Sequence, residues 1–240
     1  MGLFSRQRTL PHYTVDIHSH LLPGIDDGVE TWEQSLDILK ELARLGFSKA
    51  ITTPHILAEF YPNSPDTILP LRDELESLLL KEKIPISIEA AAEYYVDESF
   101  MELLDSSDEP LCFGDKKYVL FETGFLNEPR FLREAIFKLK SRGYQPLMAH
   151  PERYTYFQEN PELLQEYAEL TLFQVNVMSL MGYYSSIAKG IAKQLAKANQ
   201  IAFLGSDLHK PKQLPAFKEA VGTKLYRNIL EQPLLNSSLQ

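Results

Sequence analysis

The sequence predicts an α/β protein folded as one distorted barrel of seven strand–helix pairs. Short β-branched or aromatic runs alternate with longer segments of helical period along most of the 240 residues. Parallel strands need crossover helices and bury both of their faces, which matches this alternation. Five of the six histidines fall at or near the C-terminal end of a predicted strand, where parallel α/β folds carry their active sites. An open doubly wound sheet is the alternative arrangement.

The first half of the chain supplies three of the seven pairs. The first strand covers 13–17, and the helix after it carries Leu36, Leu39 and Leu42 on one side and stops at Gly46. Next come a strand over 50–53, a helix over 66–80, a strand over 86–94 and a short helix over 98–104.

The second half repeats the pattern four times. It contains strands over 118–122, 146–149, 172–177 and 201–204, and helices over 129–142, 161–168, 187–198 and 214–230. We therefore expect a domain over 13–232, a peripheral N-terminal arm over 1–12 and a peripheral C-terminal tail over 233–240.

Composition and absent motifs exclude several classes of function. The formal charge of −9 disfavours broad binding to nucleic acid or anionic lipid. Cys112 is the only cysteine, no apolar run could span a membrane, and the chain start lacks a secretory signal, which favours the cytoplasm. The residue six after Cys112 is Tyr118, so a Cys-x5-Arg phosphatase loop is absent and Cys112 is expected to be structural. Nucleotide-binding loops and a serine-hydrolase elbow are also missing.

Histidines and carboxylates at the predicted strand ends indicate a metal site. His18 and His20, and likewise Asp207 and His209, have the spacing that places two side chains on one face of a strand. Imidazole and carboxylate suit zinc, manganese or iron. The candidates are His18, His20, Asp27, His55, Glu93, Glu122, His150, Asp207 and His209. Nine ligands exceed the needs of one ion, and a surplus of metal charge would attract an anion such as a phosphate ester.

Some assignments stay open at this level. Glu89 shares the strand parity of Glu93, and Asp26 could replace Asp27. Asp16 lies deeper, where a hydrogen bond to a ligand histidine is the expected role.

Arg153 is the candidate for clamping a phosphoryl oxygen, because guanidinium offers a rigid pair of donors. The alternative is an ordinary surface ion pair with Glu152.

Together the motifs resemble the polymerase and histidinol phosphatase (PHP) superfamily. They are Asp16-Ile-His-Ser-His20, Pro23-Gly-Ile-Asp-Asp-Gly28, Thr53-Pro-His55, Glu93, Glu122, His150-Pro-Glu-Arg153 and Gly205-Ser-Asp-Leu-His209. Their spacing is most similar to the bacterial protein tyrosine phosphatases of the CpsB/YwqE group. One departure is Ala91-Ala92 before Glu93, where relatives often carry glycine.

The resemblance implies a distorted (β/α)7 PHP barrel with three divalent ions, of which manganese is expected and iron, zinc, cobalt or magnesium are possible. One ion would take His18, His20, Glu93 and Asp207. A second would share Glu93 and take Glu122 and His150, and a third would take Asp27, His55 and His209.

The implied reaction is metal-assisted hydrolysis of phosphotyrosine, on the tail of a bacterial tyrosine kinase of polysaccharide export. Arg153 would contact phosphate, and Asp207 or His209 would supply a proton. Aromatic residues on the loops could stack on the phenyl ring, namely Phe60, Tyr61, Tyr94, Tyr95, Phe125, Tyr154, Tyr156, Tyr183 and Tyr184.

Three rival functions follow from the same residues. A histidinol phosphate phosphatase would share the metal chemistry but would need a carboxylate for the substrate's ammonium group. A PHP-type nuclease conflicts with the charge of −9. A metal-stabilised scaffold without activity would not need Arg153 beside intact ligands.

Overall fold

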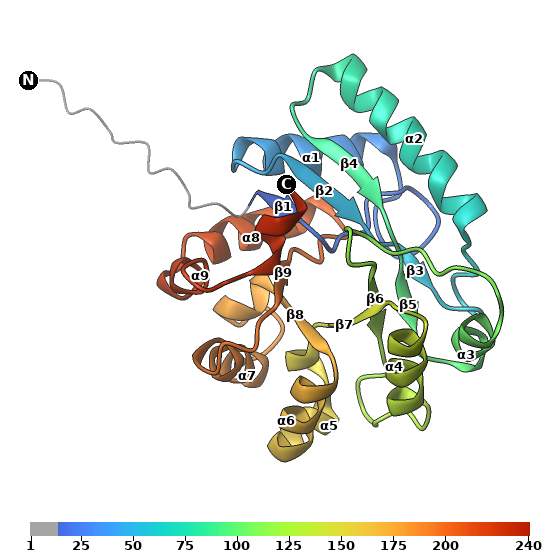
Figure 1. Cartoon of the computed structure of the whole chain (residues 1–240). Coiled ribbons are helices and arrows are strands. Elements are labelled where there is room, and N and C mark those ends of the chain that lie inside the picture. Colours follow the sequence, from blue (N-terminus) through green and yellow to red (C-terminus); the bar gives the residue numbers. More distant parts are fainter. Residues whose placement is uncertain (1–13) are drawn as a thin grey trace, which may run out of the picture.

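The computed structural model describes residues 14–240, so the predicted N-terminal arm lies outside the described residues. Within that range the strands form a ring with the helices around it (Figure 1), and every pairing between named strands is parallel. The strands are β1 (Val15–Asp16), β2 (Lys49–Thr52), β3 (His55–Ile56), β4 (Ser87–Ala90), β5 (Glu93–Tyr95), β6 (Tyr118–Glu122), β7 (Gln145–Ala149), β8 (Leu172–Asn176) and β9 (Phe203–Gly205). The predicted barrel-like α/β architecture is confirmed.

Two of the predicted strands are interrupted, which distorts the ring. The expected single strand over 86–94 is wrong, because Ala91-Ala92 divides it into β4 and β5. Pro54 similarly separates β2 from the unpredicted β3 and cannot donate a ladder hydrogen bond. The neighbouring backbones stay in register across both breaks, since the Ala91 amide donates to the Thr52 carbonyl at 2.9 Å. One sheet, β1-β2-β4, therefore gives way to a second, β3-β5-β6-β7-β8-β9.

The first and last strands meet along a seam that is held differently at its two ends. At the carboxyl end, the Asp207 amide donates to the His18 carbonyl at 2.8 Å, and the His20 amide donates to the Leu208 carbonyl at 2.9 Å. At the amino end, the side chain of Asn236 lies between the strands. Its amide donates to the carbonyls of Val15 and Leu204 and accepts from the Leu204 amide at 3.0 Å.

The expectation of a peripheral tail over 233–240 is therefore wrong. Asn236 is fully buried, and Leu239 packs on Phe113 and Tyr118 under the amino end of the barrel. A primary amide carries both a donor and an acceptor, so it can substitute for the missing backbone pairing.

The helices follow the predicted order, with two differences. They are α1 (Trp32–Arg44), α2 (Pro65–Glu82), α3 (Glu98–Asp105), α4 (Leu132–Ser141), α5 (Thr155–Glu159), α6 (Pro161–Leu170), α7 (Ser186–Lys197), α8 (Leu214–Val221) and α9 (Lys224–Ile229). The expected helix over 214–230 is divided, because Thr223 caps a new helix by accepting from the Tyr226 amide. The short α5 was not predicted.

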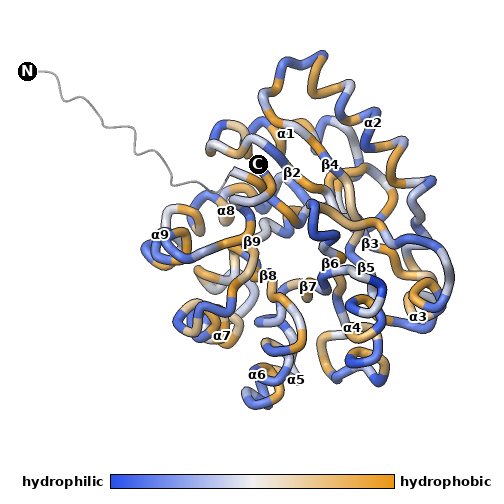
Figure 2. The backbone as a smooth tube through the Cα atoms, viewed as in Figure 1, coloured by the Kyte–Doolittle hydropathy of each residue, from blue (hydrophilic) through white to orange (hydrophobic). Residues whose placement is uncertain are grey.

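Apolar side chains pack on both sides of the ring. Figure 2 shows apolar and polar residues alternating along the helices, and the larger core lies between these helices and the strands. A smaller core, which includes Ile17, Ile51, Leu147 and Phe203, fills the inside of the ring. No helix within residues 14–240 is both long and apolar enough to cross a membrane.

Candidate metal centre

All nine predicted ligand side chains come together at the carboxyl end of the ring. A cavity of about 380 Å³ opens there, and its lining includes Asp27, His55, Glu93, Glu122, His150, Asp207 and His209. His18 and His20 lie fully buried against Glu93 and Asp207 at this end. Glu122 ends β6, and His150 follows directly on the end of β7. His55 and Glu93 instead begin the short strands β3 and β5, and Asp27 lies in the loop after β1.

Four of these residues lie close together. The Nε2 atoms of His18 and His20 lie 3.3 Å apart, and they lie 3.1 and 3.3 Å from Oε2 of Glu93. Oδ1 of Asp207 is 3.5 Å from His18 Nε2 and 3.7 Å from His20 Nε2. Ligands at about 2.1 Å from a tetrahedral ion are about 3.4 Å from one another. These five distances are of that size, and His18, His20 and Asp207 together offer ligand atoms to one divalent ion.

Glu93 connects this group to a second one. Its Oε1 lies 3.1 Å from His150 Nε2, and Oε2 of Glu122 lies 3.7 Å from the same nitrogen. His55 Nδ1 completes the surroundings, at 3.3 Å from Glu93 Oε2 and 3.1 Å from Glu122 Oε1. Because the two oxygens of Glu93 face different neighbours, this carboxylate is placed to bridge two ions.

A third group lies toward solvent. Oδ1 of Asp27 is 3.4 Å from His55 Nε2 and 3.3 Å from His209 Nε2. His55 thus directs one ring nitrogen to this group and the other to the group around Glu122.

The tautomers of three imidazoles suit metal binding. Nδ1 of His18 donates to Gln174 Oε1 at 2.8 Å, Nδ1 of His20 donates to Asp26 Oδ2 at 2.8 Å, and Nδ1 of His209 donates to the Asp207 carbonyl at 3.1 Å. In the neutral imidazole each Nε2 then carries no proton and directs its lone pair toward the carboxylates.

Buried polar atoms without partners also indicate cations. Among the described residues, His55 Nδ1 and Glu93 Oε2 are buried and make no hydrogen bond. Leaving a buried carboxylate oxygen unpaired is costly, and a coordinated ion would remove that cost. The donor set of nitrogen and carboxylate oxygen fits borderline divalent metals.

The carboxylates create a strong negative field around the imidazoles. Burial alone would lower the pKa of His20, but Asp26 opposes it and raises the pKa to about 10. Burial would also lower the pKa of His55, but the carboxylates of Glu93, Asp27 and Glu122 outweigh this effect and raise the pKa of His55 to about 12. A field that attracts protons this strongly also favours divalent cations in their place.

The structure separates the residues that the sequence left ambiguous. Glu89 forms an ion pair with Lys49, whose Nζ is 2.8 Å away, and takes no part in the cluster, whereas Glu93 is inside it. Asp27 faces His55 and His209. Asp26 instead accepts from His20 Nδ1 and from the His55 amide, so it orients ligands.

Asp16 does not make the expected hydrogen bond to a ligand histidine. Its oxygens accept from the Ser206 amide at 2.8 Å and the Ser206 hydroxyl at 2.6 Å, across the seam. Gln174 takes the expected role on His18.

Sequence reasoning missed Gln174 and Asn176, and it named Tyr184 only as a ring that could stack on the substrate. Asn176 Nδ2 donates to Asp207 Oδ2 at 2.6 Å, and the Tyr184 hydroxyl donates to the same oxygen at 3.3 Å. The signal for two of them was present: Gln174 and Asn176 are alternate polar residues in an otherwise apolar strand.

Arg153 lies in the cavity and not on the surface. Glu152 turns away from it and accepts from the Asn176 amide and the Ser179 hydroxyl. The guanidinium carbon of Arg153 lies 4.8 Å from the ring centre of Phe125 and 4.4 Å from that of Tyr184. Its Nη1 donates to Asp207 Oδ2 at 2.9 Å, which leaves its other donors for an anion.

Asp207 is poorly suited to the predicted role of proton donor. Burial alone would raise its pKa, but His18, His209 and Arg153 hold the pKa well below the usual value. Three donors on Oδ2 keep the carboxylate ionised and leave Oδ1 for a metal.

Asp207 and His150 both have left-handed backbones, with φ of 53° and 35°. Such a conformation at two strand ends is typical of functional sites.

Comparison with known proteins assigns the family. Residues 14–232 match the family model for capsular polysaccharide synthesis, CpsB/CapC. The chain belongs to the CpsB/CapC family. The tyrosine-protein phosphatase YwqE of Bacillus subtilis is 33% identical over 82% of this chain and 78% of its own length. The tyrosine-protein phosphatase CpsB of Streptococcus pneumoniae is 22% identical over 85% of this chain and 86% of its own.

Solved structures agree with the CpsB/CapC assignment. A chain from the crystal structures of YwqE from Bacillus subtilis and CpsB from Streptococcus pneumoniae, which are metal-dependent tyrosine phosphatases, superposes with a TM-score of 0.79 and 29% identity. The match covers 94% of this chain and 95% of that one. The histidinol phosphate phosphatase of Lactococcus lactis shares the fold, with a TM-score of 0.55 at 15% identity over 88% of this chain and 93% of that one.

Proposed function

We propose that this chain is a metal-dependent protein tyrosine phosphatase. The observation that carries the proposal is the joint position of Arg153 and the ligand cluster on one cavity whose walls include Tyr61, Phe125 and Tyr184. Membership in the CpsB/CapC family supports it.

The proposed cofactor is a set of three divalent ions, with manganese as the expected metal. His18, His20, Glu93 and Asp207 would hold the first, Glu93, Glu122 and His150 the second, and Asp27, His55 and His209 the third. When bound, such ions supply Lewis acidity to the phosphoryl group and make water more acidic.

The chain's own residues bind and orient the substrate. Arg153 is held by two aromatic rings and by Asp207, so its free donors point in a fixed direction toward a phosphoryl oxygen. Phe125 is 39% exposed and offers a face to a phenyl ring. A phenolate, with a pKa near ~10, leaves more easily than an alkoxide. His209 is the remaining candidate for proton donor, because the contacts of Asp207 keep it ionised.

The proposed physiological substrate is the phosphorylated tail of a bacterial tyrosine kinase, acted on in the cytoplasm, in control of capsular or exopolysaccharide synthesis. The family description, which concerns capsular polysaccharide synthesis, and the names of the relatives support this proposal.

The test compares kcat/KM for a tyrosine-phosphorylated kinase-tail peptide, its phosphoserine counterpart and histidinol phosphate under one metal condition. We expect the phosphotyrosine peptide to be preferred. A higher value for histidinol phosphate would overturn the tyrosine phosphatase assignment, and no turnover of any aryl phosphate by the metal-loaded protein would favour a scaffold.

A further inference from the structure

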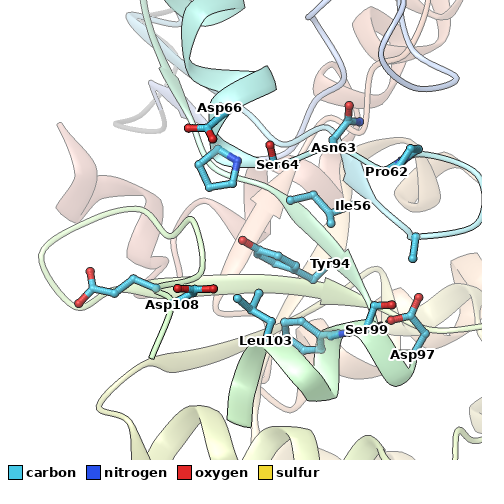
Figure 3. A pocket seen from close by; sticks show the side chains of 14 residues that line it. Ile56, Pro62, Asn63, Ser64, Asp66, Tyr94, Asp97, Ser99, Leu103 and Asp108 are labelled. Atoms are coloured by element: carbon cyan, nitrogen blue, oxygen red, sulfur yellow. Dashed lines mark hydrogen bonds between the residues drawn. The ribbon is translucent and has the colours of Figure 1, made fainter. Parts of the chain in front are cut away.

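A second and larger cavity lies on the other side of the strands that carry the metal ligands. It measures about 630 Å³ and is bordered by the loop between β3 and α2 and by α3 with the segment that follows it. Figure 3 shows Tyr94 and Leu103 in its middle, with Asp66, Asp97 and Asp108 around it.

The two cavities share a wall that is one strand layer thick. In β3, His55 lines the metal cavity while the next residue, Ile56, lines the second cavity. Glu93 and Tyr94 divide in the same way in β5. Successive side chains of a strand point to opposite faces, which explains the division. The loop after β3 also borders both cavities, since Tyr61 lines the first and Pro62 the second.

The middle of the second cavity is apolar. Ile56, Tyr94, Phe100 and Leu103 provide it, and the rings of Tyr94 and Phe100 stack at 5.0 Å. Tyr94 is fixed from behind, because its hydroxyl accepts from the Leu111 amide at 2.7 Å. Such a surface suits an aliphatic or planar side chain.

The edge of the cavity is acidic. It holds Asp66, Asp97, Asp108 and Glu109, and no Lys or Arg is among the lining residues. None of these four carboxylates makes an ion pair within residues 14–240, although Asp97 caps α3 by accepting from the Phe100 amide. Arg142 donates to the backbone carbonyls of Leu103 and Asp108 and forms no ion pair with these carboxylates.

We propose that this cavity binds an arginine or lysine side chain of the phosphorylated protein, close to its phosphotyrosine. The long stem of such a side chain would pack on the apolar middle, and its charged end would reach the carboxylates. The proposal deepens the proposed function and rests on it, because the loop after β3 borders both cavities, so residues that flank the phosphotyrosine would pass over this loop to the second cavity.

Geometry sets the spacing between the two residues. A peptide would pass from one cavity to the other over the loop after β3, where Tyr61 borders the first cavity and Pro62 the second, and an extended peptide covers about 3.4 Å per residue. The basic residue should therefore lie about three to five positions from the phosphotyrosine.

The experiment uses three phosphotyrosine peptides that differ only in the residues four positions before and after the phosphotyrosine. Both positions carry arginine in the first peptide, citrulline in the second and glutamate in the third. Citrulline has nearly the same shape as arginine without the charge. We expect kcat/KM to be about fivefold higher with arginine than with citrulline, through KM, and lower again with glutamate. Equal values for the three peptides would overturn the proposal.

Matched variants locate the effect. Asp66→Asn combined with Glu109→Gln should remove the preference for arginine and leave 4-nitrophenyl phosphate hydrolysis unchanged. Glu74→Gln combined with Glu76→Gln makes the same change in net charge on exposed positions of α2 outside the cavity, and should keep the preference. If the double variant Asp66→Asn with Glu109→Gln still preferred the arginine peptide, the proposal would be overturned.

A second measurement separates this proposal from the proposed function. Fluorescence anisotropy of labelled arginine and citrulline peptides, both without phosphate, reports binding without any turnover. Loss of all phosphatase activity would contradict the proposed function, whereas equal binding of the two peptides would contradict the cavity proposal alone.

Discussion

At the scale of single residues, the site depends on side chains whose two ends face different partners. Asp207 directs one oxygen to His18 and His20 and the other to Arg153, Asn176 and Tyr184. The proposed phosphate-binding group, Arg153, and the proposed metal ligands are therefore held in one hydrogen-bonded unit. Substitutions of Arg153 and of Tyr184, which both contact Asp207, should therefore change the kinetics in different ways.

Replacing Arg153 by Ala should lower kcat by about 10²-fold while the metal content stays near that of the wild type, because one donor to the developing charge is lost. Steady-state kinetics with metal analysis by mass spectrometry checks this. Arg44→Ala, at an exposed position, is the control. Unchanged kinetics in Arg153→Ala would remove Arg153 from phosphate binding.

Replacing Tyr184 by Phe keeps the ring beside Arg153 and removes only the hydroxyl, which donates to Asp207 and accepts from Asn176. We expect kcat to fall about fivefold, because Asp207 loses one of its donors, with little change in KM. Tyr184→Leu, which also removes the ring, should raise KM as well. Tyr183→Phe alters a neighbouring exposed tyrosine and should match the wild type. Identical rates in Tyr184→Phe and Tyr183→Phe would contradict the positioning role.

At the scale of elements, close approach between strands fixes the ligands. A Cβ on Gly205 would lie 2.7 Å from His18 Cβ and 2.8 Å from Gln174 Nε2. Only glycine lets β9 come this near to the end of β1. Gly205 therefore determines where the side chain of His18 can lie.

Gly205→Ala should lower the free energy of unfolding by about 1–3 kcal/mol and reduce metal content, because His18 and Gln174 must move together. Urea denaturation and metal analysis measure the two effects. Gly190→Ala in α7 is the matched control, since a Cβ there meets nothing within 4 Å and alanine favours a helix. If Gly205→Ala kept its full metal content, the close approach of β9 to the end of β1 would not determine the position of His18.

The order of elements and the ligand-type residues were predictable because both leave local patterns. The strand over 118–122 is found with those bounds, and the histidines sit where the strands end. The break at Ala91-Ala92, the role of Gln174 and the burial of Asn236 were not predictable in this way. Each depends on a partner far along the chain, such as His18 for Gln174, and no local pattern records such a partner.

At the scale of the whole molecule, four carboxylates and five imidazoles share one end of the barrel. Thorough chelation should abolish hydrolysis and lower the Tm, because the stabilisation that bound ions give to the folded state would be lost. Manganese should restore both the rate and the Tm. Cys112→Ser should behave as the wild type throughout. A rate that persists in the metal-free protein would contradict the metal-dependent mechanism.

Asn236→Ala should lower the free energy of unfolding by about 2–4 kcal/mol, because three buried backbone groups lose their partner. Chemical denaturation gives the value. Ser238→Ala, at an exposed position of the same segment, should change it little. Equal stability of the two variants would mean that the seam does not need Asn236.

The seam also sets the order in which the protein can be completed during synthesis. Val15 and Asn236, which meet there, are 221 residues apart. Ribosomes add about 5–20 residues per second, so β1 waits about 10–45 s for this partner. His18 and His20 emerge at the start of that interval, whereas Asp207 and His209 emerge near its end. The first metal group is therefore incomplete on the nascent chain until late in translation, and the free edge of β1 needs protection until then.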